Sequence, residues 1–406
     1  MLSRFTFSTR GGNGMFSSDP EMLDWLVEVR RYFHMHPEVS HQEYGTTKKI
    51  AAILKSIGID VFLYDDITGA VGTIKGVTGK PTIGLRADID ALPMKELNTT
   101  DYKSVNDEVM HSCGHDANTT IMLGTAKKVV ETDLAAKMKG NAKFIFQPAE
   151  ERGSGAKAMI ASGVLENPHV DRVIAGHMSP DLPVGKVGIF HSIGYASGDR
   201  FALQITGKGG HGGRPEECMD PIVAGSFFVN QIQSIVSRNI KPTEAAVVTV
   251  GKFVAGNAAN VIPETAVIEG SIRALTSSVR DQVFNRLQDM AHGLEKTFEV
   301  QCEFNIHPGV PILINNSMVA ESLYDVSVKV LGPENVSYLP PIMGSEDFSY
   351  FTLERPSAIM RLGCSNEKRG IVNFLHSPYF DIDEAVLEIG TEIFYQAVKS
   401  YLSHSK

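Results

Sequence analysis

The stretch Met110-His-Ser-Cys-Gly-His-Asp-Ala-Asn118 places a thiol, Cys113, two residues before an imidazole, His115. Residues 117–130 carry apolar side chains at near-helical spacing, so we expect this motif to lie where a loop enters a helix. A thiolate and an imidazole are both good zinc ligands, and the pair is therefore a candidate for part of a divalent metal site. A Cys-x-His pair alone is a weak signal, and the interpretation depends on what else the chain places beside it.

Three strand-like runs each end in residues that handle metals or protons. The run that begins at Pro81 leads to Asp88 and Asp90. The run from Ala142 leads to Glu150 and Glu151, and the run from Val173 leads to His177. The carboxyl ends of strands are where α/β folds place their chemistry. The repetition therefore predicts one site built from several strand ends.

The order of elements predicts an α/β protein of two domains. Strands and helices alternate up to residue 197 and again from 309 to 406, which favours a mostly parallel sheet. Residues 198–308 instead follow the order strand–helix–strand–strand–helix–strand, which is typical of a ferredoxin-like α+β domain. We expect a catalytic domain of residues 15–197 and 309–406, an inserted domain of residues 198–308, and a disordered leader of residues 1–14.

Composition narrows the class of protein. The 406 residues are enough for two domains, and the net charge of −9 without a basic run argues against nucleic-acid and anionic-membrane partners. No apolar stretch approaches the roughly 18 residues that a membrane span needs. The 4 cysteines are scattered without the spacing of a disulfide framework, which suits a reducing compartment, and we expect a cytoplasmic protein.

Six motifs, in order from about residue 21 to 400, resemble the metal-dependent aminoacylase/carboxypeptidase superfamily. The branch they resemble contains hippurate hydrolases, N-acyl-amino-acid amidohydrolases and auxin-conjugate hydrolases. The motifs are Cys113-Gly-His-Asp116, Gln147-Pro-Ala-Glu-Glu151, Gly176-His177, Gly209-Gly-His-Gly212, Asn260-Val-Ile-Pro263 and Leu375-His-Ser377. The resemblance implies two divalent metal ions (zinc, manganese or cobalt) per subunit. The ligands that it implies are Cys113, His115, Glu151, His177 and His376, and Cys113, as a thiolate, is a candidate to bridge the two ions.

The resemblance also implies the remaining site residues. Glu150 is expected to be the general base, because a carboxylate outside the metal's coordination shell can move a proton between water and the leaving nitrogen. Asp90 resembles the carboxylate that orients a histidine ligand, whereas the role of Asp88, structural or functional, stays open. His211 matches the residue that stabilises the oxyanion. Asn260 and Arg273 are candidates for binding the substrate carboxylate.

Two positions depart from the family pattern. Asn118 and Glu216 stand where the family commonly has histidine. Neither belongs to the expected ligand set, so catalysis should survive, but a relative's substrate cannot simply be carried over. The acids Glu216 and Glu217 suggest the hypothesis that the substrate carries an amine, which kinetics of Glu216→His on basic and neutral acyl-amino acids would test.

The resemblance implies an amidohydrolase that converts a small N-acyl amino acid into a carboxylic acid and a free amino acid. The nearest rival is a carboxypeptidase or dipeptidase of the same superfamily, which shares the metal chemistry. A rival of another class is a non-catalytic metal-containing protein that binds amino-acid conjugates, although a pure binding site has no need of Glu150. We expect the inserted domain to act as a lid and to mediate a homodimer.

Overall fold

The computed structural model describes residues 16–403, so the expected leader of residues 1–14 lies outside the described part of the chain. The chain divides into two compact units, a smaller one of Ile193–Leu313 and Pro341–Ser349 and a larger one of the rest. The segment 341–349 differs from the predicted division, which gave it to the larger domain. It joins the smaller unit because the Ala196 N–H donates to the carbonyls of Ile342 and Gly344, at 3.1 and 3.0 Å.

The larger unit contains a sheet, its covering helices and two short 3-10 turns. Its strands are β1 (Asp60–Leu63), β2 (Ala70–Ile74), β3 (Thr82–Asp88), β4 (Asn141–Gln147), β5 (Arg172–Pro183), β6 (Val187–Ile189), β15 (Val336–Tyr338) and β16 (Ser357–Ser365). Its helices are α1 (Pro20–Met35), α2 (Tyr44–Ser56), α3 (His115–Glu131), α4 (Leu134–Lys137), α5 (Gly155–Ala161), α8 (Ser317–Leu331) and α10 (Ala385–Ser403), with turns η3 (Pro333–Asn335) and η4 (Glu367–Arg369). The elements β7 (Ile193–Tyr195), β14 (Leu313–Ile314) and α9 (Ser349–Glu354) fall where the chain passes between units.

The eight strands of this sheet follow the order β1-β2-β4-β3-β5-β16-β6-β15. The central strands β4, β3, β5 and β16 are parallel, and β2 and β6 flank them in the antiparallel direction. Parallel neighbours end at the same edge of a sheet, and Asp88 at the end of β3 pairs with Gln147 at the end of β4. The prediction of a mostly parallel α/β sheet is confirmed.

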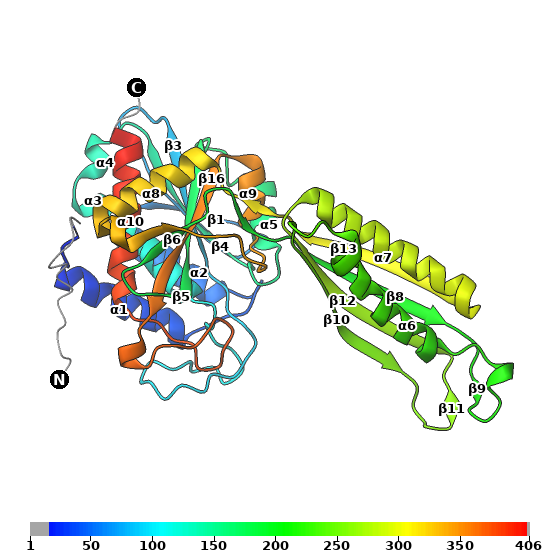
Figure 1. Ribbon diagram of the computed structural model, residues 1–406. Helices are drawn as coiled ribbons and strands as arrows, with labels where there is room; N and C mark the ends of the chain where they lie inside the picture. The colour runs from blue at the N-terminus through cyan, green and yellow to red at the C-terminus, as the bar shows by residue number, and fades with distance from the viewer. Residues whose placement is uncertain (1–15, 404–406) are drawn as a thin grey trace. The chain divides into compact units, whose positions relative to one another are not determined.

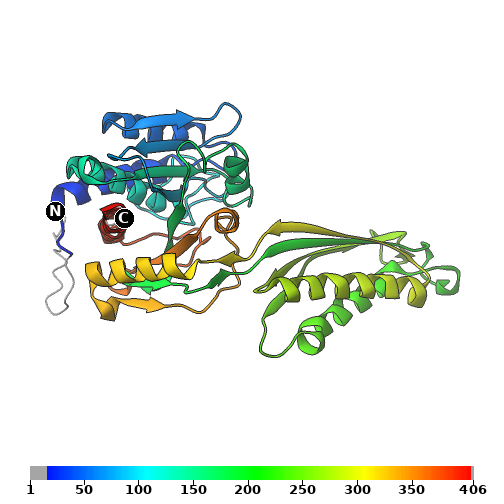
Figure 2. The same cartoon turned by 90° about the horizontal axis from the view of Figure 1, so that it is seen from above.

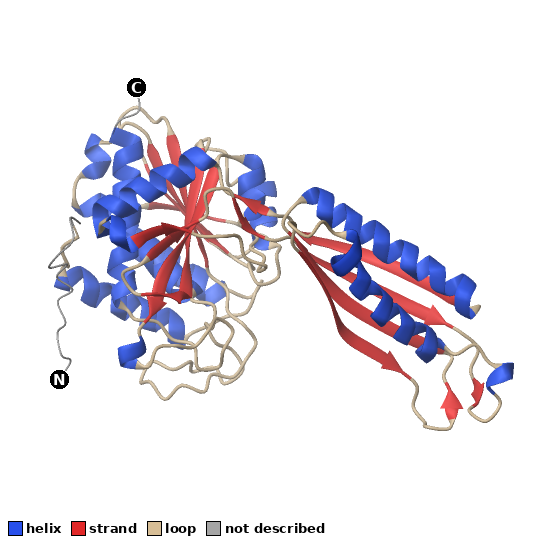
Figure 3. Cartoon of the chain, in the orientation of Figure 1, coloured by secondary structure: helices blue, strands red, loops and turns tan. Residues whose placement is uncertain are grey.

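Helices cover both sides of this sheet. Helices α1, α3, α8 and α10 lie on one side and α5 on the other (Figure 1), and Figure 3 shows the strands between them. Helix α1 begins at Pro20 after Asp19, whose side chain accepts hydrogen bonds from the first turn, and it buries Leu26, Val29 and Phe33 at helical spacing. Helix α3 is buried along most of its length. The site motif at its start is therefore held in the core.

The smaller unit has a four-stranded sheet in the order β10-β12-β8-β13. Its elements are β8 (Gly198–Thr206), β9 (Gly210–His211), η1 (Pro215–Glu217), α6 (Pro221–Ser234), η2 (Ile235–Asn239), β10 (Ala246–Ala255), β11 (Val261–Ile262), β12 (Thr265–Ala274), α7 (Ser277–Phe298) and β13 (Gln301–Val310). Figure 2 shows α6 and α7 on the same face of this sheet. Strand β8 alternates, with Phe201, Leu203 and Ile205 buried toward the helices. The predicted ferredoxin-like order is confirmed.

Candidate metal centre

Seven of the predicted site residues come together at the carboxyl edge of the large sheet. Asp90 follows β3, Glu150 and Glu151 follow β4, and His177 lies within β5. Cys113 and His115 flank Gly114, which precedes α3 with φ of 83°, a left-handed conformation that suits glycine. A Cβ at this position would lie 2.6 Å from the Met178 side chain, so the loop packs closely against β5.

The ligand atoms form two overlapping groups. The first is Cys113, His115 and His177, and the second is Cys113, Glu151 and His376, with the atoms of each group within 4.8 Å of one another. Cys113 Sγ lies 3.6 Å from His177 Nε2, and His376 Nε2 lies 3.4 Å from Glu151 Oε1. Because the groups share Cys113, the arrangement suits two ions that share one sulfur ligand.

Two of the histidines are oriented by their second ring nitrogen. His115 Nδ1 lies 2.9 Å from the Asp90 carbonyl oxygen, and His177 Nδ1 lies 2.9 Å from the Met178 carbonyl oxygen. A carbonyl only accepts, so each Nδ1 carries a proton, and each Nε2 faces the cluster. The Asp90 carboxylate also lies 3.3 Å from His115 Nδ1.

An orphaned polar atom tests whether these residues fit a metal. His115 Nε2 is buried and has no hydrogen-bond partner among the described residues, and Glu151 Oε1 is buried beside the His376 ring, 3.4 Å from its Nε2. Burial lowers the pKa of His177 to about 4, so this imidazole is neutral and its lone pair is free near pH 7. Burial and the Glu151 carboxylate raise the pKa of the Cys113 thiol, which a divalent cation would reverse. The donor set therefore fits a metal.

Asp88 is held by two neighbours, and its Oδ2 also lies 3.8 Å from His115 Nε2. Arg86 Nη1 donates to its Oδ2 at 2.7 Å, and Asn118 Nδ2 donates to its Oδ1 at 2.7 Å. Burial alone would raise the pKa of Asp88, but the charges of His115 and Arg86 lower it to about 2. These contacts favour the structural interpretation of Asp88, and they give Asn118 a defined role as its partner.

His376 reaches the cluster through a constrained backbone. Its φ is 64°, a conformation that costs a residue other than glycine of order 1–3 kcal/mol. Its N–H donates to the Ser112 carbonyl at 2.8 Å, which ties the His376 loop to the Cys113 loop. The imidazole is the most exposed of the five predicted ligands, with 53% of its side chain accessible.

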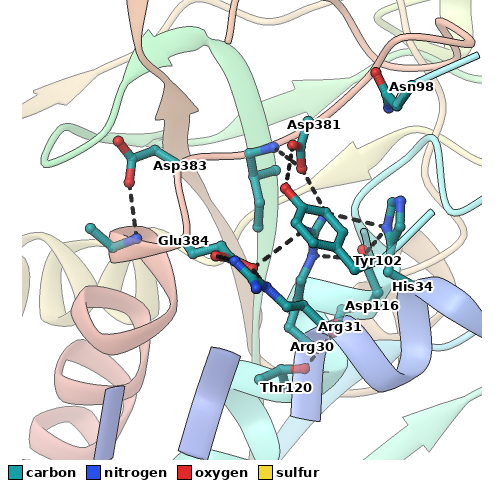
Figure 4. Close-up of polar contacts among 12 residues, drawn as sticks. Arg30, Arg31, His34, Asn98, Tyr102, Asp116, Thr120, Asp381, Asp383 and Glu384 are labelled. Atoms are coloured by element: carbon teal, nitrogen blue, oxygen red, sulfur yellow. Dashed lines mark hydrogen bonds and ion pairs between the residues drawn. The ribbon is translucent and has the colours of Figure 1, made fainter. Parts of the chain in front are cut away.

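A buried polar network lies next to the centre, and sequence reasoning missed it (Figure 4). Arg30, on α1, is fully buried and pairs with Asp116 at 2.8 Å and with Asp381 at 3.0 Å. His34 Nδ1 lies 2.7 Å from the same Asp116 carboxylate. The network thus joins α1 both to the start of α3 and to the segment that follows His376.

The three remaining predicted residues belong to the smaller unit. His211 pairs with Val261 across β9 and β11, and the Gly212 N–H donates to the Asn260 carbonyl at 2.9 Å, so His211 and Asn260 are neighbours. Strand β12 then runs from Thr265 past Arg273, which is roughly 27 Å at about 3.4 Å per residue. Arg273 donates to Ser345 Oγ at 2.6 Å. Within one chain, Arg273 does not share a subsite with His211 and Asn260.

A model of the peptidase family M20/M25/M40 matches residues 84–400. The chain belongs to this family. It is 35% identical over 392 residues to the IAA-amino acid hydrolase ILR1-like 4 of Arabidopsis thaliana, a match that covers 95% of this chain and 88% of the relative. It is also 35% identical over 385 residues to the N-acetyl-L-cysteine deacetylase of Bacillus subtilis, covering 94% and 89%.

A solved structure of this family has the same fold. It is that of a Bacillus subtilis protein described as a dinuclear metal-binding peptidase from the M20 family. The TM-score is 0.82 at 31% sequence identity, and the match covers 95% of this chain and 100% of that one. The resemblance inferred from the six motifs is confirmed. In the described residues, no helix is long and apolar enough to cross a membrane.

Proposed function

We propose that the protein is a metal-dependent amidohydrolase that cleaves N-acyl amino acids into a carboxylic acid and a free amino acid. The observation that carries the proposal is the pairing of two ligand groups around Cys113 with a second carboxylate beside them. One oxygen each of Glu150 and Glu151 and a ring nitrogen of His115 lie within 4.8 Å of one another. A binding site needs Glu151 alone, whereas hydrolysis also needs a base.

The five residues Cys113, His115, Glu151, His177 and His376 would hold two divalent ions. A set of one thiolate, three imidazoles and one carboxylate suits zinc, cobalt or manganese. When bound, such ions lower the pKa of water and polarise the substrate carbonyl. The residues around the site then have to direct this activated water toward the substrate carbonyl.

Glu150 is the general base in this proposal. It removes a proton from the attacking water and returns it to the amide nitrogen as the C–N bond breaks, so the products are a carboxylic acid and an amine. A positioned base typically contributes a factor of about 10²–10⁴ in rate. Asp90 keeps the His115 ring in the orientation that presents Nε2.

We assign His211 the role of stabilising the oxyanion and Asn260 that of binding the substrate carboxylate. The Gly212 N–H bonds the Asn260 carbonyl next to the β9–β11 pair, which supports giving His211 and Asn260 parts of one subsite. Arg273 is a separate candidate for binding the substrate carboxylate. It lies far along β12 from His211 and Asn260, and its guanidinium bonds Ser345. His211→Ala should lower kcat more than KM, whereas Asn260→Ala and Arg273→Ala should mainly raise KM.

The acyl group is left to experiment, because the two relatives named above differ in theirs. The test is amino-acid release by the Mn²⁺- or Zn²⁺-reconstituted protein from N-acetyl, N-benzoyl and indole-acetyl amino acids and from dipeptides. Metal-dependent release from one acyl class supports the proposal. Faster release from dipeptides would favour a carboxypeptidase or dipeptidase, and no release with two ions bound would favour a binding protein.

We further propose a cytoplasmic homodimer in which the smaller unit acts as lid and dimer contact. The scattered cysteines, all free in the structure, support a reducing compartment. Light scattering tests the oligomeric state, and a monomeric mass at micromolar concentration would contradict the homodimer.

A further inference from the structure

The segment that contains Glu150 and Glu151 is held in place by hydrogen bonds from three consecutive backbone amides, those of residues 149–151. The amides of Glu150 and Glu151 donate to the two oxygens of Asp90, each at 3.1 Å. The preceding amide, that of Ala149, donates to Glu43 Oε1 at 2.8 Å. Glu43 and Asp90 are 0% and 1% exposed, so two buried carboxylates hold the whole segment.

The Ala149 amide is the one that most needs a partner. Ala149 has φ of 51°, a left-handed conformation that costs an L-residue roughly 1–2 kcal/mol. The residue is fully buried, so its N–H would otherwise have no water to bond. The Glu43 side-chain oxygen supplies the acceptor that this N–H needs. The Glu43 bond therefore stabilises a backbone turn that the chain would not adopt on its own.

Glu43 is itself fixed from the other side. Thr68 Oγ1 donates to Glu43 Oε2 at 2.5 Å, and Thr68 is 6% exposed. The loop that carries Glu43 also sends Ser40 to Asp90, with Ser40 Oγ 2.6 Å from Asp90 Oδ2. The loop between α1 and α2 thus contacts both carboxylates that hold the 149–151 segment.

We propose that Glu43 is a positioning residue for the hydrolytic reaction, holding the Ala149 amide so that Glu150 and Glu151 project into the metal centre. The inference rests on the proposed function for its kinetic consequence, but not for its consequence on metal binding. Among the described residues, the side-chain hydrogen bonds of Glu43 go to Thr68 and to the Ala149 amide and not to a predicted metal ligand, so Glu43 acts through the backbone of residues 149–151. If Glu43 only contributed to packing, its replacement would change kcat and Co²⁺ affinity no more than replacement of its partner Thr68.

The test compares Glu43→Ala, Glu43→Gln and Thr68→Val in the full-length protein, with kcat and KM measured on the metal-loaded form and Co²⁺ affinity measured by absorption titration of the metal-free form. Glu43→Ala should lower kcat by about 10²-fold at unchanged KM, because a displacement near 1 Å at the reacting groups costs that much. Its Co²⁺ affinity should fall by about tenfold, the lower end for residues that orient ligands. Glu43→Gln keeps an acceptor for Ala149 and should restore both values, whereas Thr68→Val removes only the bond that fixes Glu43 from the other side and should lower both values less than Glu43→Ala does.

Equal kcat and equal Co²⁺ affinity in Glu43→Ala and Thr68→Val would overturn the proposal. If Glu43→Ala does not fold, Glu43→Asp carries the test, since its carboxylate is set back by one methylene, and wild-type values for it would equally overturn the proposal. The two proposals fail separately. If the wild type has no hydrolase activity, the proposed function is refuted. If Glu43→Ala nevertheless binds Co²⁺ more weakly than Thr68→Val, the positioning role is supported.

Discussion

Replacing Arg30 by Met should destabilise the larger unit by about 3 kcal/mol. Breaking a buried ion pair by removing one partner typically costs about 3–5 kcal/mol, because the other charge stays buried without compensation. Arg30 and Asp116 are both 0% exposed, which places the pair in that class. The lower end of the range applies because His34 also bonds Asp116. The pKa of His34 is raised despite the burial of its ring.

Urea denaturation of the metal-free protein measures this loss. Trp25, the one tryptophan of the chain, lies on α1 with Arg30 and reports on the larger unit. With an m value of about 2–3 kcal/mol/M, a loss of about 3 kcal/mol lowers the urea midpoint by roughly 1–1.5 M. Adding Asp116→Asn to Arg30→Met removes the stranded charge and should recover part of the loss.

Arg31→Met is the matched control. Its guanidinium is bonded to Glu384 at 2.8 Å but is 31% exposed, and exposed pairs contribute about 0–1 kcal/mol. If Arg30→Met and Arg31→Met lower the midpoint equally, the reasoning from buried charge is refuted. A double variant less stable than Arg30→Met alone would also count against it.

Three further predictions concern Cys113 and two residues that follow it in the chain, Gly114 and Asp116. Cys113→Ser should reduce the binding of both ions in a titration by atomic absorption, whereas His177→Ala should weaken one, because Cys113 belongs to both ligand groups; equal losses would contradict the sharing. Gly114→Ala should lower both metal affinity and melting temperature, since its φ is 83° and its Cβ would meet Met178 at 2.6 Å; wild-type affinity would contradict this. Burial alone would raise the pKa of Asp116, but Arg30 and His34 hold it well below its usual value. Its contribution to stability is therefore present above about pH 4 and lost as the pH falls toward the folded-state pKa, so the free energy of unfolding should fall less between pH 4 and 2 in Asp116→Asn than in the wild type.

The sequence could predict those parts of the centre that follow regular elements. Strand ends are marked by apolar runs, so Asp90, Glu151 and His177 could be placed at one sheet edge before any coordinates. The ferredoxin-like order was readable for the same reason, because β8 alternates buried and exposed side chains along its length. His376 was recognisable only by resemblance, since its position depends on a left-handed backbone that no periodicity encodes.

Contacts between distant segments could not be predicted from the sequence. Arg30 bonds Asp381 across 351 positions, and Glu43 bonds Ala149 across 106. In the sequence, Arg30 and Glu43 each look like an ordinary charged residue at a helix, and only the packing of the chain brings each to its partner. The separation of Arg273 from His211 is a similar case, because motif order does not report the length of the strand that lies between them.

The most direct measurement on the central claim is turnover by Glu150→Gln, made together with its metal content. The variant keeps the size of the side chain and removes the base, while Glu151 and the other ligands stay. The account predicts two bound ions, as in the wild type, and a fall in kcat of about 10²–10⁴. Wild-type turnover with both ions bound would contradict the assignment of Glu150 as the base.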